Sequence, residues 1–279
     1  LSLNIVPDSL VDQQHCAGEF DLAEVPLDES NLAHRAAVSM VQAHGLTVNN
    51  LNLHLHIDKA VPVAGGMAGG SADAAAALLA VDQYLYEKRL SERTLGLEEL
   101  LALAAPLGAD VPFVVRAAFP LGGLAVGEGT GTELRIVELP EDMIPLDIVL
   151  VAASEGLSTP QVFSELDEGR AAGRYPEAGE LQVPSGLLHA LTQTEAPIAR
   201  IHEIGRQLRN DLQGPAVTLA PDLETILTMD NESMVEAFVS GSGPTVAILA
   251  EDAAAADELA SALRRRGRHA IATQTPAML

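Results

Sequence analysis

The sequence is poor in cysteine and in long apolar stretches, and each shortage excludes a class of protein. A single cysteine, Cys16, cannot form an internal disulfide framework, and we expect a reducing compartment, the cytoplasm. Apolar runs such as residues 74–81 are far shorter than the roughly 18–20 residues that a membrane-spanning helix needs. The sequence therefore indicates neither a disulfide-stapled domain nor a membrane protein.

Basic residues are also scarce. Sixteen Lys and Arg stand against 39 Asp and Glu, which gives a net charge of −23. Such a surface repels nucleic acid and anionic lipid. The one basic cluster, residues 264–268, ends a predicted helix, where positive charge complements the helix dipole. If the ligand is an anion, backbone N–H groups have to hold it.

The N-terminal half reads as a mixture of strand and helix. Residues 51–57 alternate apolar and polar side chains, which predicts a half-buried strand. His54 and His56 share its polar face, but no third metal ligand is evident and we expect both to face solvent. Helices are predicted over residues 31–45 (with Asp28 and Ser30 as N-caps and Gly45 at its end), 71–90 and 97–105. A hairpin turn is expected at residues 121–131.

Around Pro140–Pro145 a proline-bearing stretch gives way to an apolar segment, residues 146–153, which predicts a new strand. This change predicts two domains, residues 1–143 and 144–279. The second domain is expected to contain a polar stretch at 165–185, helices near 187–209 and 221–229, a strand at 246–250, a helix over 252–266 closed by Gly267, and a last strand after it. The absence of strict strand–helix alternation predicts two α+β halves rather than a doubly wound sheet.

The sharpest motif is a glycine-rich stretch, residues 62–80, which reads PVAGGMAGGSADAAAALLA. Four glycines within six positions precede a predicted helix capped by Ser71, so that free N–H groups meet the positive end of a helix dipole. Such an array binds phosphate, whereas an ordinary turn, the alternative, seldom needs so many glycines. No Lys-Ser/Thr pair follows, which excludes a Walker-type loop, and the spacing does not match the dinucleotide fingerprint.

Asp110, within GADVPF (residues 108–113), is the candidate for acid–base chemistry. We expect it at a helix-to-strand junction among apolar neighbours, where a solvated surface acid is unusual. A hydroxyl that accepts a phosphoryl group needs a positioned carboxylate to take its proton. A helix-capping aspartate is the equally weighted alternative.

Together these segments resemble the GHMP kinases, a family that includes galactokinase and the homoserine, mevalonate and phosphomevalonate kinases. The glycine-rich loop and its helix resemble the family's second motif, and GADVPF resembles its catalytic-aspartate motif. Residues 159–163, TPQVF, are similar to a cytidine-site segment of one branch, and residues 210–212 and 239–245 resemble later motifs of the substrate domain. The resemblance covers essentially the whole chain in order.

The resemblance implies a two-domain α+β fold, with a ribosomal-protein-S5-like N-terminal half and a ferredoxin-like C-terminal half. It implies a kinase that uses ATP and Mg²⁺, with Asp110 as the catalytic residue that also contacts substrate. The residues expected to bind ATP are Asn31, Lys59, Pro62, Val63, Ala64, Gly65, Gly66, Met67, Ala68, Gly69, Gly70, Ser71 and Ala72. A solvated strand-end lysine is the alternative for Lys59.

The same resemblance implies a substrate, a cytidine-diphosphate-linked methylerythritol of non-mevalonate isoprenoid biosynthesis, phosphorylated on its 2-hydroxyl. Phe163 would stack on the cytosine, Thr159 would form a hydrogen bond near the base, and Gly241, Ser242 and Gly243 would lie close to the substrate phosphates. The alternatives are a core role for Phe163 and a plain turn at residues 241–243. We expect a monomer or weak homodimer.

Two departures from the family keep other readings open. The family begins with a Lys-x-Asn-Leu strand, whose lysine is catalytic, and continues with a Gly-Tyr-His-Glu-Leu segment; neither occurs here. Residues 2–5 mimic the first motif but lie too close to Asn31, so we expect the chain as written to have little activity. Residues 116–120 look like a small insertion. The alternatives are a homoserine- or mevalonate-type kinase and a truncated, non-catalytic nucleotide-binding form.

Overall fold

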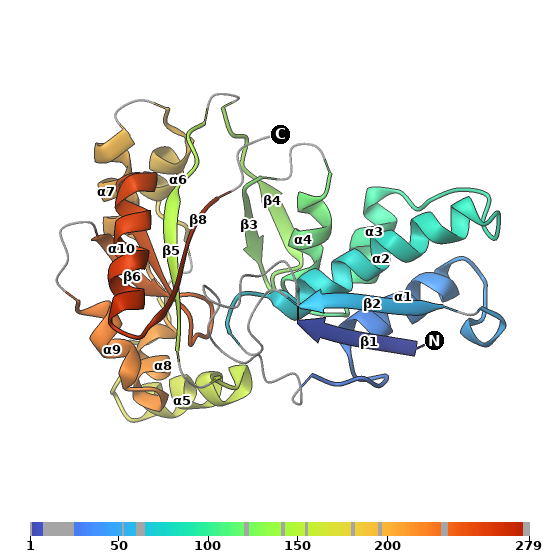
Figure 1. The fold of residues 1–279 in the computed structure, drawn as a ribbon, viewed down its shortest axis with the longest axis horizontal. Coiled ribbons are helices and arrows are strands. Elements are labelled where there is room, and N and C mark those ends of the chain that lie inside the picture. Colours follow the sequence, from blue (N-terminus) through green and yellow to red (C-terminus); the bar gives the residue numbers. More distant parts are fainter. Residues whose placement is uncertain are drawn as a thin grey trace. The chain divides into compact units, whose positions relative to one another are not determined.

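The computed structural model describes residues 2–7, 25–51, 53–59, 65–119, 123–140, 143–153, 156–179, 182–194, 197–229 and 234–275 (Figure 1). These residues form two compact units. The first contains residues 2–7, 25–59 and 68–138, and the second contains residues 65–67 and 139–275. The units divide after Glu138, whereas the sequence places a domain boundary after residue 143; that boundary stays a prediction.

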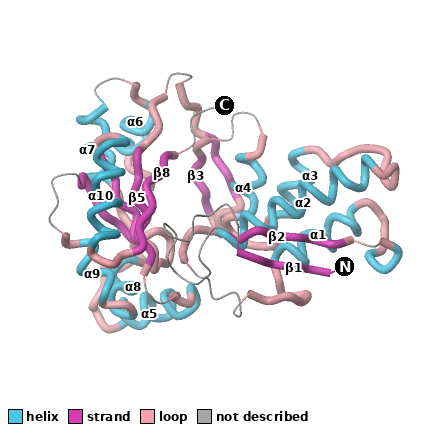
Figure 2. Tube along the Cα trace, viewed as in Figure 1, coloured by secondary structure: helices cyan, strands magenta, loops and turns pink. Residues whose placement is uncertain are grey.

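The first unit combines a parallel strand pair, a helical layer and a hairpin (Figures 1 and 2). Strand β1 (Ser2–Pro7) pairs in parallel with β2 (His54–Lys59). The helices are α1 (Leu32–Ala43), the one-turn η2 (Val48–Asn50), α2 (Gly69–Glu87), α3 (Leu97–Ala104) and α4 (Val111–Ala117). Strands β3 (Ala125–Glu128) and β4 (Glu133–Ile136) form the predicted hairpin. The predicted strand begins at His54, and its two histidines are exposed as expected.

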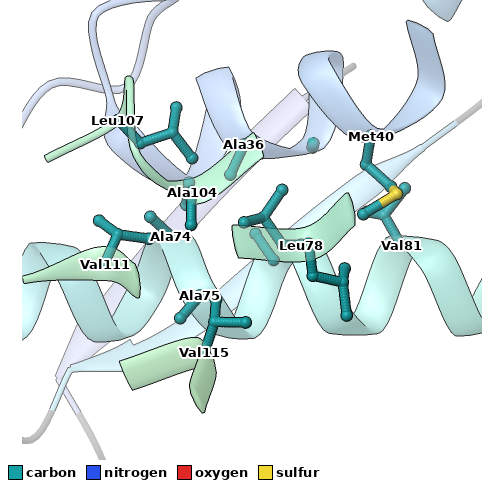
Figure 3. Packing of buried hydrophobic residues seen from close by; sticks show 14 of the residues in the cluster. Ala36, Met40, Ala74, Ala75, Leu78, Val81, Ala104, Leu107, Val111 and Val115 are labelled. Carbon is teal, nitrogen blue, oxygen red and sulfur yellow. The ribbon is translucent and has the colours of Figure 1, made fainter. Parts of the chain in front are cut away.

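Alanines of α2 determine how the helices of this unit pack. Ala74 and Ala75 lie on the same side of α2 as Leu78 and Val81, against α1 and α4 (Figure 3). Because an alanine side chain is short, the neighbouring helices approach closely and the larger side chains fill the remaining space. The fully buried partners include Ala36 and Met40 of α1, Ala104 of α3, and Val111 and Val115 of α4.

One buried carboxylate ties three segments of the first unit together. Asp82 of α2 accepts a hydrogen bond from the backbone N–H of Leu95 at 2.9 Å. Its other oxygen lies 2.7 Å from Nε2 of His44, the residue that ends α1. Both side chains are almost fully buried, so Asp82 joins α1, α2 and the segment that leads into α3 without a solvent-exposed link.

The second unit is built on a four-stranded antiparallel sheet in the order β6-β7-β5-β8. Its strands are β5 (Asp147–Ala152), β6 (Met234–Val239), β7 (Val246–Ala250) and β8 (His269–Gln274). Helices separate β5 from β6 and β7 from β8, which interleaves two strand–helix–strand units as in ferredoxin-like folds. The fold expected for this half is confirmed.

Helices of the second unit contribute to two apolar clusters, one for each face of the sheet. Val149 and Val151 of β5 belong to the cluster that contains side chains of α5 (Thr159–Ala171), α8 (Gln213–Leu219), α9 (Asp222–Leu227) and α10 (Ala253–Arg265). Ile148, which points to the other face, belongs with α6 (Ser185–Thr192) and α7 (Pro197–Gln207). The region expected as one helix near 187–209 is thus two helices, and α8 and β6 were not predicted.

A buried arginine joins α7 to its neighbours. Arg200 is only 2% exposed, and its guanidinium donates to the carbonyl oxygens of Ala190 and Ile144, both at 2.9 Å, and of Leu191 at 3.4 Å. Burial lowers the pKa of Arg200 from its ordinary value. In the part of the chain that the structure describes, no carboxylate pairs with it, so this positive charge is held by backbone dipoles alone.

Candidate active site

The glycine-rich loop leads into α2 earlier than the sequence predicts. The helix begins at Gly69, and the residue before it, Ala68, has a φ of 52° in the left-handed region. Ser71 lies in the first helical turn and makes no capping hydrogen bond, so its predicted role as N-cap is wrong. Glycines continue into the helix itself, which leaves the first-turn N–H groups without bulky side chains beside them.

Three of the predicted motifs meet at the N-terminus of α2 within the first unit. A Cβ built on Gly70 would lie 3.7 Å from a methyl carbon of Leu32 at the start of α1, and one built on Gly108 would lie 4.0 Å from the Ser71 hydroxyl. The hairpin turn also reaches this region, because a Cβ at Gly131 would lie 2.9 Å from the carbonyl oxygen of Ala109. The segment before Asp110 therefore lies beside the start of the helix that follows the glycine-rich loop.

Asn31 is the N-cap of helix α1, a role that was not predicted from the sequence. Its side-chain oxygen accepts the N–H of Ala33 at 2.8 Å and caps α1, while its amide donates to the carbonyl of Pro26 at 2.8 Å. The predicted caps, Asp28 and Ser30, instead bond to each other one turn earlier, with Asp28 accepting from the N–H and hydroxyl of Ser30. Asn31 is 8% exposed, and its proposed nucleotide contact stays a prediction.

Asp110 occupies a different environment from the one expected. It lies between α3 and α4, at the residue before α4, and VPFVVRA is helix rather than strand. Its side chain is exposed, and it makes no capping hydrogen bond. Among the described residues nothing pairs with this carboxylate. The expected junction with a strand and the expected apolar enclosure are therefore wrong, but the carboxylate is free to act on a ligand.

In the second unit, residues 240–245 form a tight turn between β6 and β7, which we call the 240–245 turn. The N–H of Ser240 donates to the carbonyl of Thr245 at 2.8 Å, and the N–H of Gly243 donates to that of Ser240 at 2.8 Å. Gly241 and Gly243 have φ values of 57° and 79°, a conformation that other residues rarely adopt. The turn therefore requires its glycines for its own geometry.

The 240–245 turn is tied to two segments that sequence reading associates with substrate. The hydroxyls of Thr159 and Ser242 lie 2.9 Å apart, which places the start of α5 directly beside the turn. Asn210 donates from one amide to the carbonyls of Val239 at 2.7 Å and Gly241 at 2.8 Å. The structural role of Asn210 was not predicted, although residues 210–212 were singled out as a motif.

Helix α5 presents Phe163 to the surface. The ring is 50% exposed, so the alternative of a core residue is not supported, and it lies one turn after Thr159. The far end of α5 is fixed by Tyr175, whose hydroxyl donates to Glu165 at 3.0 Å and lies 2.7 Å from the Thr218 hydroxyl of α8. A Cβ at Gly169 or Gly214 would approach the Tyr175 ring to 2.1 or 3.0 Å, so both glycines make room for it.

The remaining predicted site residues lie either in the second unit or outside the described part of the chain. Gly65, Gly66 and Met67 belong to the second unit. Pro62, Val63 and Ala64, and the side chain of Lys59, lie outside the described residues. Within the described ranges, no group of three His, Cys, Asp or Glu side chains could hold a metal ion. The same ranges contain no helix long and apolar enough to cross a bilayer.

Comparison with known proteins identifies the family. Residues 31–117 match the family described as "GHMP kinases N terminal domain", and residues 188–269 match "GHMP kinases C terminal". A protein of Paenarthrobacter aurescens named "4-diphosphocytidyl-2-C-methyl-D-erythritol kinase" is 42% identical over 277 residues, which cover 99% of this chain and 78% of that protein. A protein of Corynebacterium jeikeium with the same name is 43% identical over 268 residues, 92% of this chain and 71% of that protein.

Solved structures agree with this result. A "4-(cytidine 5'-diphospho)-2C-methyl-D-erythritol kinase" superposes with a TM-score of 0.64 at 29% identity, over 98% of this chain and 81% of that chain. A homoserine kinase from Cytophaga hutchinsonii has a TM-score of 0.58 at 15% identity, over 99% of this chain and 82% of that chain, which shows the shared fold alone. The chain belongs to the GHMP kinase family, on the branch of the 4-diphosphocytidyl-2-C-methyl-D-erythritol kinases.

Proposed function

We propose that the protein transfers the γ-phosphate of ATP to the 2-hydroxyl of 4-diphosphocytidyl-2-C-methyl-D-erythritol, giving the 2-phosphate and ADP. Relatives at 42–43% identity carry the name of this activity. The structural observation that supports it best is the hydrogen bond between Thr159 and Ser242, because it joins the two segments that the resemblance assigns to the cytidine and to the phosphates of one substrate. The reaction belongs to a cytoplasmic enzyme, monomeric or weakly dimeric.

The cytidine end of the substrate is assigned to α5. The exposed ring of Phe163 stacks on the cytosine, a contact worth about 1–3 kcal/mol for an aromatic side chain and a base. Thr159 forms a hydrogen bond near the base, and Gly241, Ser242 and Gly243 lie near the diphosphate. The buried Ser242 hydroxyl holds Thr159 in place, which leaves the backbone of the turn to face the ligand.

The nucleotide is assigned to the glycine-rich loop and the start of α2. Backbone N–H groups of the loop, residues 62–72, hold the ATP phosphates, and the positive end of the α2 dipole adds to the attraction. This arrangement suits a chain with a net charge of −23, because it binds phosphate without requiring lysine or arginine side chains, which are scarce in this sequence. Asn31 and Lys59 complete the nucleotide pocket in this proposal.

Asp110 is assigned as the proton acceptor. As the substrate oxygen bonds to the γ-phosphorus, the carboxylate takes the hydroxyl proton, and the bond from phosphorus to the ADP oxygen breaks with its electron pair on ADP. An exposed carboxylate without a protein partner is available for this role. Gly108, two residues before Asp110, lies beside Ser71 at the start of α2, where the phosphates are assigned.

Magnesium is expected to accompany ATP, and the side chains fit an ion that arrives with the nucleotide. In the described ranges there is no cluster of three acidic or histidine side chains, as a resident metal would need. Mg²⁺ in kinases is held by one or two protein oxygens together with phosphate oxygens and water, and Asp110 can supply one such oxygen. When bound, the ion neutralises charge on the phosphates.

A substrate panel tests the proposal. The full-length protein is incubated with ATP, Mg²⁺ and either the cytidyl substrate, homoserine or mevalonate, and ADP release and product mass are measured. Turnover of the cytidyl substrate alone is expected. Equal turnover of homoserine or mevalonate would favour another GHMP kinase activity, and nucleotide binding without any turnover would favour a non-catalytic form. Gly69→Val should weaken ATP binding at least tenfold, equivalent to about 1.4 kcal/mol.

A further inference from the structure

The glycine-rich loop makes direct backbone contact with the 240–245 turn, and both segments belong to the second unit. The N–H of Thr245 donates to the carbonyl of Gly65 at 3.3 Å. The hydroxyl of Ser240 donates to the carbonyl of Gly66 at 3.0 Å, across 174 residues of sequence. Two consecutive carbonyls of the loop assigned to ATP are therefore held by the turn assigned to the substrate.

The two backbones are too close for any side chain between them. A Cβ at Gly66 would lie 2.5 Å from the carbonyl oxygen of Ser240 and 2.6 Å from that of Gly243, and one at Gly241 would lie 3.1 Å from the carbonyl oxygen of Gly66. These are contacts of main chain with main chain, which have no flexible side chain to absorb a displacement. A displacement of the 240–245 turn must therefore displace Gly66, and a displacement of Gly66 must displace the turn.

The geometry of the peptide bond gives these contacts a consequence for anion binding. In a trans peptide the C=O and the N–H point in opposite directions. When Thr245 holds the Gly65 carbonyl and Ser240 holds the Gly66 carbonyl, the N–H groups of Gly66 and Met67 are directed away from those partners. Among the described residues, nothing accepts a hydrogen bond from these two N–H groups. Successive free N–H groups next to a left-handed residue form an anion-binding concavity, and Gly66 has a φ of 71°.

We propose that Ser240 is a positioning residue through which substrate and ATP promote each other's binding. The inference rests on the proposed function, since it takes the 240–245 turn as substrate-binding and the loop as nucleotide-binding. Substrate that orders the turn fixes the Ser240 hydroxyl on Gly66 and thereby aims two amides at the nucleotide phosphates. Coupling of two ligands is reciprocal, so ATP raises the affinity for substrate by the same factor.

The test is a binding cycle on the full-length protein. The dissociation constant of a non-hydrolysable ATP analogue is measured by calorimetry with and without saturating cytidyl substrate, for wild type, Ser240→Ala and Ser240→Thr. In wild type we expect substrate to tighten the analogue about fivefold or more, within the usual range of coupling factors. Ser240→Ala should bring this factor close to one and raise the KM for ATP, and Ser240→Thr, which keeps a hydroxyl, should restore it.

The matched control is Ser261→Ala, which removes a hydroxyl of the same unit that accepts a hydrogen bond from Arg264; it should keep the full coupling factor. Equal thermal midpoints of the variants show that the fold is intact. An unchanged factor in Ser240→Ala, or a factor of one in wild type although both ligands bind, overturns the inference and leaves the proposed function standing. Failure of wild type to bind either ligand overturns the proposed function itself, and this inference with it.

Discussion

Thr159 and Ser242 are joined by a 2.9 Å hydrogen bond between their hydroxyl oxygens, although 83 residues separate them. The Ser242 side chain is buried, whereas Phe163, one turn further along α5, is half exposed. The start of α5 is therefore anchored to the 240–245 turn and offers an aromatic ring to the outside. A ring carried by an anchored helix loses less conformational freedom when a base stacks on it than a ring on a mobile segment does.

Phe163→Ala should weaken the cytidyl substrate and spare ATP. Loss of about 1–3 kcal/mol of stacking raises the KM for that substrate roughly 5- to 150-fold. Steady-state kinetics with each substrate varied in turn measure the two effects. Ile198→Ala, which truncates a similarly exposed apolar residue of the same unit, is the control and should change neither KM. An unchanged KM for the cytidyl substrate in Phe163→Ala would remove the stacking assignment.

Asp110→Asn should abolish most of the turnover without changing stability. Loss of a general base lowers kcat by about 10²–10⁴-fold. The carboxylate is exposed and makes no cap, so the melting temperature should stay within error of wild type. Asp257→Asn, on the exposed side of α10, serves as control. Near-normal kcat in Asp110→Asn would return Asp110 to an ordinary surface position at the start of a helix.

Alanine at two glycines of the same loop should have opposite effects on stability. At Gly66 it would combine a left-handed backbone, which costs about 1–2 kcal/mol, with overpacking against the 240–245 turn, which costs about 1–3 kcal/mol. At Gly70, which is helical and has its nearest neighbour at 3.7 Å, alanine should be neutral or stabilising by up to about 1 kcal/mol.

Urea unfolding of the two variants gives the comparison. If Gly66→Ala is as stable as Gly70→Ala, the loop does not lie against the turn as described. Because of this clash, weakened ATP binding in a Gly66 variant would not by itself reveal a phosphate contact, and Gly69 is the better position for testing one.

Removal of the Asp82 carboxylate should destabilise the first unit strongly. Asp82→Ala leaves the Leu95 N–H and the His44 ring without their partner, and each buried polar group left without a hydrogen bond costs about 1–3 kcal/mol. Asp82→Asn keeps one acceptor oxygen and should cost clearly less. Urea unfolding at neutral pH measures both variants. A loss below about 1 kcal/mol for Asp82→Ala, the value of an exposed pair, would contradict the buried arrangement.

Glu99 should make stability depend on pH in the acid range. Hydrogen bonds from Arg93, and then from the Gly96 N–H, lower the pKa of Glu99 from 4.5 to about 2. Because the folded-state pKa is the lower one, the stabilisation is complete above about pH 4.5 and is lost as the pH falls towards 2. The advantage of wild type over Glu99→Gln in melting temperature should shrink through that window. A constant difference from pH 7 to about pH 2, measured at low salt, would contradict the assignment.

Local patterns predicted most of the first unit and the core of the second. Alternation located β2, the alanine-rich run located α2, and Gly45 and Gly267 mark helix ends with φ values of 70° and 78°. Strand β6 was missed because a register shift between Met234 and Glu236 interrupts its alternation. Helix α8 was missed because Gly214 and Pro215 in its first turn resemble a loop.

The site depends more on contacts that sequence cannot show. The need for glycine at position 66 comes from the backbone of Ser240 and Gly243, far along the chain. The exposure of Asp110 follows from the helix α4, which stands where the sequence predicts a strand. The segment is rich in β-branched residues, which favour strands, but burial of Val111 and Val115 in the core stabilises the helix. The capping role of Asn31 is local, but Asp28 and Ser30 just before it are also residue types that cap helices, so the sequence alone does not select Asn31.

The guanidinium of Arg200 relies on carbonyl oxygens, and this choice of partner matters in acid. Protonation neutralises a carboxylate such as that of Asp222, which partners Arg268 in the same unit and whose pKa is lowered chiefly by the hydrogen bond from Arg268. The carbonyls of Ala190 and Ile144 have no proton to gain in that range, so Arg200 keeps its partners. As acid loosens this unit, the corner where α6, α7 and the approach to β5 meet should open at a lower pH than the contact between Asp222 and Arg268, and amide hydrogens at that corner should stay protected longer.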